Sequence, residues 1–116
     1  MNWTNIETRQ DIDNILEQSK QTPCLIFKHS TSCHMSEMSK YIIESEWNLE
    51  KEQLKPYCLD ILKHKDLAVK IAEQFNEHHQ SPQVLLIQGG ECFYEESHLN
   101  ISYEEMEEEI KFLLNR

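Results

Sequence analysis

The sequence predicts an α/β fold with a central mixed sheet flanked by helices, and three observations support this fold class. Apolar strand-like runs alternate along the chain with amphipathic helical segments. Two of these runs, "CLIF" and "VLLI", are continuous, which is typical of strands buried on both faces. Gly89 and Gly90 separate the last two strand-like runs, as a tight antiparallel hairpin requires.

The strands and helices can be placed in order along the chain. Strands are predicted at "WTNI", "PCLIFKH", "PYCLDIL", "QVLLIQ" and "ECFYEE". Helices are predicted over Thr8–Ser19, Cys33–Glu50, the segment "KDLAVKIAEQFNE" and the segment after Ser102. Strands joined through helices should be parallel, and the last two antiparallel. This order is the thioredoxin-like one.

Two of the helices carry more detailed predictions. In the second, Met38, Tyr41, Ile42 and Leu49 recur at helical spacing. In the last, Ser102 and Glu105 predict a capping box, and the buried stripe is expected at Tyr103, Met106, Ile110 and Leu113.

Length and composition indicate one domain, over residues 1–116. The net charge of −10 argues against a nucleic-acid partner, because that binding depends on neutralising phosphates. No apolar run approaches the roughly 20 residues that cross a bilayer, and the N-terminus lacks the apolar core of a signal peptide. We therefore expect no membrane association and a cytoplasmic location.

Among the four cysteines, Cys33 alone follows a strand and a polar loop to begin a helix. The strand should carry it to the carboxyl edge of the sheet, where open α/β folds place their sites. The free N–H groups of the helix start favour a thiolate, the reactive form of cysteine. Ser36, one turn on, can donate a hydrogen bond to that thiolate but cannot form a disulfide. His29 and His34 are candidates to add charge or relay a proton.

Ser81-Pro82 precedes a buried strand and should face this site. In the predicted fold we expect a cis peptide there, which would leave backbone groups of Ser81 free to pair with a peptide-like substrate. The neighbouring His78 and His79 are expected to form an exposed polar loop.

No metal site is expected, because no spaced pair of Cys or His ligands recurs. Cys24, Cys58 and Cys92 lie in apolar or strand-like segments, where cysteine acts as a small buried hydrophobe. Cys24 is at the far end of the strand before Cys33, up to about 30 Å away along an extended chain. None of the three is expected to resolve a disulfide on Cys33.

Three segments, "FKHSTSCHMS", "SPQVLLIQGG" and "ESHLNIS", together resemble the monothiol bacilliredoxins, the YtxJ-like proteins of the bacillithiol system. The resemblance spans nearly the whole chain and implies a thioredoxin-like fold. It also implies removal of bacillithiol from protein mixed disulfides. The family pattern is close to T-C-P-I-S, so the nucleophile and the serine correspond to Cys33 and Ser36, while His34 replaces the proline.

The function we expect is therefore monothiol disulfide exchange at Cys33, as an enzyme. Its partners would be S-thiolated client proteins and a low-molecular-weight thiol such as bacillithiol, with no tightly bound cofactor. Catalytic roles fall to Cys33, Ser36 and His34, and substrate binding to Ser81, Pro82 and His29. Two alternatives stay open: a non-catalytic adaptor domain, and an iron–sulfur cluster held between two chains by Cys33 and a small thiol.

Overall fold

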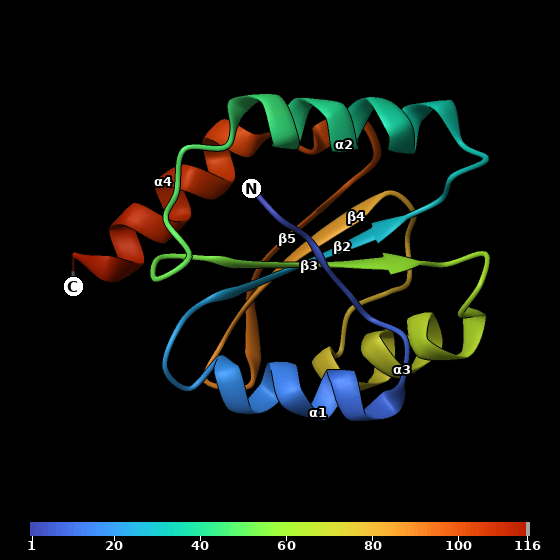
Figure 1. Ribbon diagram of the computed structural model, residues 1–116, viewed down its shortest axis with the longest axis horizontal. Helices are drawn as coiled ribbons and strands as arrows, with labels where there is room; N and C mark the ends of the chain where they lie inside the picture. Colours follow the sequence, from blue (N-terminus) through green and yellow to red (C-terminus); the bar gives the residue numbers. More distant parts are fainter. Residues whose placement is uncertain (116) are drawn as a thin grey trace.

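The computed structural model describes residues 1–115, which form one mixed sheet with helices on both faces (Figure 1). The strands are β1 (Thr4–Asn5), β2 (Cys24–His29), β3 (Lys55–Asp60), β4 (Gln83–Gln88) and β5 (Glu91–Ser97). The helices are α1 (Arg9–Gln18), α2 (His34–Glu46), α3 (Lys65–Phe75) and α4 (Tyr103–Leu114), with a short 3-10 turn, η1 (His98–Asn100), before α4. The predicted element order is confirmed.

The strand order is β1-β3-β2-β4-β5, which places β2 at the centre of the sheet. β1, β3 and β2 are parallel, and β5 is antiparallel to β4 as expected. The expectation that helix-joined strands are all parallel is wrong for β4, which runs antiparallel to β2. The chain after α3 returns to the edge where β3 ends, so β4 begins there and Gln83 pairs with Lys28.

The sheet separates two apolar layers. α1 and α3 cover one face, where Ile15, Ile26 and Leu85 belong to the same buried cluster. α2 and α4 cover the other, where Phe27, Ile43 and Met106 are fully buried. All six residues of β2 are buried, which confirms the interpretation of its continuous apolar run. Alternate residues of β2 therefore reach opposite layers.

The apolar residues that recur at helical spacing in α2 do not form its buried face. Met38, Tyr41 and Ile42 are exposed, and the buried residues of the helix are Ser36, Ser39 and Ile43. The helix also ends at Glu46, four residues earlier than predicted, so Leu49, which is buried, lies beyond it. Spacing located the helix, but Ser36 faces the sheet because its hydroxyl meets His29 and the Ser30 amide there.

The predicted turn and cap at the carboxyl end of the chain are largely as expected. Gly89 and Gly90 both have positive φ, at 59° and 78°, as a two-residue hairpin turn requires. The Ser102 hydroxyl accepts a hydrogen bond from the Glu105 amide at 3.3 Å, but the Glu105 side chain does not bond back to the Ser102 amide, so the predicted capping box is half formed. The Glu105 carboxylate accepts from the Tyr94 hydroxyl at 2.9 Å, so Glu105 ties α4 to β5. Of the predicted stripe, Tyr103, Met106 and Ile110 are buried, while Leu113 is half-buried.

Within residues 1–115, no helix has the length and apolar character needed to cross a membrane.

Candidate active site

Cys33 is the N-cap residue of α2, at the carboxyl edge of the central strand. Its backbone is extended, its amide donates to the Ser30 carbonyl at 3.2 Å, and its carbonyl accepts from the Glu37 amide at 3.0 Å. The residue is half-buried, and its thiol makes no capping hydrogen bond. The first N–H groups of a helix have no intrahelical acceptor, so this cysteine stands where backbone dipoles favour a negative charge.

Ser36 lies in α2, three residues after Cys33. It is completely buried, and its hydroxyl has two hydrogen-bond partners. Its hydroxyl oxygen accepts from the Ser30 amide at 2.9 Å and lies 2.6 Å from Nδ1 of His29. These contacts lock the start of α2 to the end of β2. They also place a polar, non-thiol side chain at the position where a dithiol protein would carry its second cysteine.

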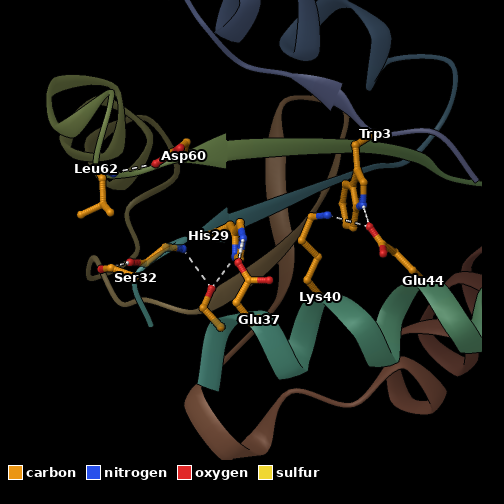
Figure 2. A network of polar contacts seen from close by, with 10 residues as sticks. Trp3, His29, Ser32, Glu37, Lys40, Glu44, Asp60 and Leu62 are labelled. Carbon is orange, nitrogen blue, oxygen red and sulfur yellow. Dashed lines mark hydrogen bonds and ion pairs between the residues drawn. The ribbon is translucent and has the colours of Figure 1, made fainter. Parts of the chain in front are cut away.

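His29 connects this serine to Glu37, and Figure 2 shows His29 at the end of β2 beside Glu37. Its Nε2 lies 3.1 Å from a Glu37 carboxylate oxygen. Because a carboxylate only accepts, Nε2 carries a hydrogen, and in the neutral ring Nδ1 is then the acceptor for the Ser36 hydroxyl. The Ser36 hydroxyl therefore donates its single hydrogen to His29. The sequence had suggested the sulfur of Cys33 as the acceptor instead.

The neutral form of His29 is the one that its surroundings favour. Burial lowers the pKa of the imidazole below its usual range, and the neighbouring Glu37 opposes that shift only in part. The ring also stacks on Phe27, with centroids 5.4 Å apart. His29 was expected to bind substrate, but it is 4% exposed with both ring nitrogens engaged, which suits a positioning role.

The remaining candidate residues lie at the same edge of the sheet but differ in exposure. His34, the first residue of α2, is exposed. The Ser81–Pro82 peptide bond is cis, Ser81 is half-buried and Pro82 is buried. The Pro82 carbonyl accepts from the His98 amide at 3.0 Å, so the "ESH" segment supports the proline loop. The three sequence segments that carried the family resemblance thus converge beside Cys33.

Sequence reasoning missed Lys28, which is completely buried and reaches the proline loop from the opposite face of the sheet. Its ammonium donates to Nδ1 of His79 at 3.2 Å. Burial lowers the pKa of Lys28 to about 8, against the attraction of Glu95 and Glu77. A lysine inside a continuous apolar strand was the available signal, since such a residue is rarely buried without partners.

Gln83 completes this second polar cluster. Its side-chain amide donates to the His78 carbonyl at 3.0 Å and to Glu95 at 2.9 Å. Lys28 and Gln83 therefore hold the loop that carries His78, His79 and the cis proline. His29, the next residue along β2, holds the loop that carries Cys33.

Comparison with known proteins identifies the family. The family model described as "Monothiol bacilliredoxin BrxC" matches residues 4–106, most of the chain and all of the candidate site. The chain belongs to the monothiol bacilliredoxin BrxC family. This confirms the resemblance that the three segments indicated.

Solved structures show that this bacilliredoxin has a thioredoxin fold. A protein described as an oxidoreductase with a thioredoxin fold is 22% identical, with a TM-score of 0.78 over 90% of each chain. Thioredoxin from Trypanosoma brucei brucei is 11% identical, with a TM-score of 0.77 over 99% of this chain and 93% of its own. Thioredoxin from Malassezia sympodialis is also 11% identical, with a TM-score of 0.73 over 96% and 90%. Family and fold together support a thiol redox role for this bacilliredoxin.

His29 and His79 lie apart in the bacilliredoxin. Over residues 1–115, no group of three or more Cys, His, Asp or Glu side chains is placed to hold a metal ion. His29 lies under α2, whereas His79 contacts Lys28 from the other face of the sheet.

The other three cysteines of this bacilliredoxin are poor nucleophiles. Burial raises the pKa of Cys24, Cys58 and Cys92 each to about 11, and Cys24 and Cys58 are also buried from solvent. At neutral pH only about one in ten thousand of such thiols is ionised. We expect iodoacetamide to label one cysteine, Cys33, in the native protein and four after denaturation. Mass spectrometry of the alkylated chain checks this, and a second rapidly labelled cysteine would contradict it.

The buried Lys28 gives this bacilliredoxin a specific pH dependence of stability. Because its pKa is lower in the folded state, the unfolded chain binds more protons between about pH 8 and 10.5, and stability rises with pH there. We expect the free energy of unfolding to rise, relative to Lys28→Met, by about 1 kcal/mol between pH 7 and 9. Urea unfolding of both proteins measures this difference, in which the titration of the shared cysteines cancels. Parallel pH profiles would contradict it.

Proposed function

We propose that this protein removes a low-molecular-weight thiol, bacillithiol or a similar one, from protein mixed disulfides by monothiol exchange at Cys33. The observation that carries the proposal is a half-buried thiol at a helix N-terminus whose would-be partner position holds a buried, hydrogen-bonded serine. Such a thiol can form a mixed disulfide but has no neighbour within the motif to resolve it.

The proposed reaction has two exchange steps. The Cys33 thiolate attacks the small-thiol sulfur of the client mixed disulfide, the disulfide bond breaks, and the client leaves as a thiolate. The small thiol is then joined to Cys33. A second thiolate, from solution, attacks the small-thiol sulfur of that disulfide and restores the Cys33 thiolate. Two disulfide bonds break and two form, so no other oxidant or reductant is needed.

The surrounding residues have supporting roles in this proposal. The cis-Pro82 loop, with Ser81 beside it, would hold the client chain extended across the sulfur. His34, exposed next to Cys33, would accept or supply the proton that accompanies thiol exchange. Ser36 and His29 would fix the start of α2 and so the direction of the sulfur. The exchange needs a reducing compartment, so we propose that the protein acts in the cytoplasm.

The test is to incubate the protein with a client that carries one bacillithiol by a disulfide. We expect the client to lose that mass and the protein to gain it on Cys33, as intact-mass and peptide mass spectrometry would report. Cys33→Ser should abolish the transfer, while Cys92→Ser, a change at a half-buried cysteine on β5, should leave it unchanged.

A client that stays modified, or a Cys33→Ser protein that still transfers the thiol, would overturn the proposal. The first result would favour the adaptor alternative, in which the fold binds partners without chemistry. An absorbing chromophore after anaerobic purification would instead favour the iron–sulfur alternative.

A further inference from the structure

A cavity of about 290 Å³ lies at the carboxyl edge of the sheet, between the start of α2 and the chain that follows β3. Thr31 and Glu37 line it on the Cys33 side, and Asp60, Lys63 and His64 line it on the β3 side. Figure 2 shows Glu37 and Asp60 projecting from α2 and β3 on either side of the end of β2. We call it the β3-side cavity.

The β3-side cavity is adjacent to the reactive cysteine. Thr31 precedes Cys33 by two residues, so their Cα atoms are at most about 8 Å apart. Glu37 follows by one helical turn, and its amide bonds to the Cys33 carbonyl at 3.0 Å. A small molecule joined to the Cys33 sulfur can therefore extend into this cavity.

The charges around the β3-side cavity are incompletely paired. Across residues 1–115, neither the Lys63 ammonium nor the His64 ring makes an ion pair or side-chain hydrogen bond with the protein. One Asp60 carboxylate oxygen accepts from the Leu62 amide at 3.0 Å, which leaves the other oxygen as an acceptor. Glu7 and Lys40 also line the cavity, and Lys40 is paired with Glu44 at 2.8 Å, so Lys63 is the unpaired ammonium group among the described residues that line it.

The geometry points to the β3-side cavity as the site of the small-thiol half of the mixed disulfide, with Lys63 and His64 binding a carboxylate on it. Asp60 accepts a hydrogen bond from an amino or hydroxyl group of the same molecule. The ligand class is thus a low-molecular-weight thiol that carries at least one carboxylate and one hydrogen-bond donor. This inference rests on the proposed exchange at Cys33, and it adds which small thiols are preferred.

The cavity also orients the exchange. Displacement at sulfur brings the attacking, central and leaving sulfur atoms into line, and the central sulfur belongs to the small thiol. The rest of the small thiol lies in the β3-side cavity. The client sulfur then lies on the side of the small-thiol sulfur opposite Cys33, where the Ser81–Pro82 loop can hold the client chain. Small thiol and client would then occupy different surfaces beside Cys33.

The test compares a client carrying glutathione, a thiol with carboxylates and an amine, with the same client carrying 2-mercaptoethanol, which has neither. Lys63→Glu should lower kcat/KM for the glutathione adduct about 10-fold, the size of one lost charge-assisted hydrogen bond, and leave the 2-mercaptoethanol adduct unchanged. Lys70→Glu is the matched control: the same charge change on α3, outside the cavity, should alter neither rate.

Equal effects of Lys63→Glu on both adducts, or no effect on either, would overturn the cavity assignment while leaving the proposed exchange intact. A wild-type protein that removes neither glutathione, 2-mercaptoethanol nor bacillithiol from the client would overturn the proposed function and this inference with it. The 2-mercaptoethanol rate of the wild type separates the two results, because that adduct does not depend on Lys63.

Discussion

Replacing Ser36 with cysteine should change the product on Cys33 from a stable mixed disulfide to an internal disulfide. Ser36 is the third residue of α2 and Cys33 its N-cap, and an N-cap side chain reaches the third helical residue. A thiol at position 36 would attack the Cys33 mixed disulfide within the same molecule. This intramolecular attack would be faster than attack by thiols in solution. Intact-mass spectrometry after treatment with oxidised bacillithiol should show a loss of about two hydrogens in place of the thiol adduct.

Ser39→Cys is the matched control for this prediction. Ser39 is also a buried serine on the sheet-facing side of α2, but it is six residues from Cys33. Six helical residues rise about 9 Å, beyond the Cα separation that a disulfide allows. Ser39→Cys should therefore keep the mixed disulfide on Cys33. A persistent thiol adduct in Ser36→Cys would show that residue 36 does not face the Cys33 sulfur.

Phe27→Ala should cause the largest loss of stability among the residues near the site. The ring is fully buried and is stacked between Trp3, at a centroid distance of 5.6 Å, and His29, at 5.4 Å. Truncating a buried phenylalanine costs about 3–5 kcal/mol of unfolding free energy, because the cavity it leaves fills only in part. Urea unfolding measures this loss.

Phe112→Ala provides the comparison on the same scale. Phe112 lies on α4 and is 72% exposed, so its removal should change the free energy of unfolding by no more than about 0.5 kcal/mol. A loss below about 1 kcal/mol for Phe27→Ala would contradict the ring stack and the burial described above.

The sequence contained enough information for the element order and for the position of Cys33. Continuous apolar runs mark β2 and β4, Gly89 and Gly90 mark the hairpin, and Cys33 begins the helix that follows the central strand. These signals are local, and each depends on a few neighbouring residues. The direction of β4 could not be predicted from such local signals, because it depends on where the chain after α3 returns to the sheet.

The hydrogen bonds that hold the site together could not be predicted from residue spacing. Periodicity assigns buried faces by apolar side chains, so it gives no reason to expect that Ser36 faces the sheet while Met38 is exposed. Ser36 is buried because Ser30 and His29 satisfy its hydroxyl, and that pairing joins β2, its loop and α2. A hydrogen bond between separate elements produces no periodic pattern in the sequence, so periodicity cannot reveal it.

The adjacency of Lys28 and His29 on β2 has a consequence for any attempt to transplant this site. Because neighbouring strand residues face opposite sides, inserting or deleting one residue within β2 would exchange the ammonium and the imidazole between the two faces. Each would then meet the wrong partners: His79 would lose its donor, and Ser36 would lose its acceptor. Grafting of "KHSTSCHMS" onto another scaffold therefore has to conserve strand parity as well as residue identity.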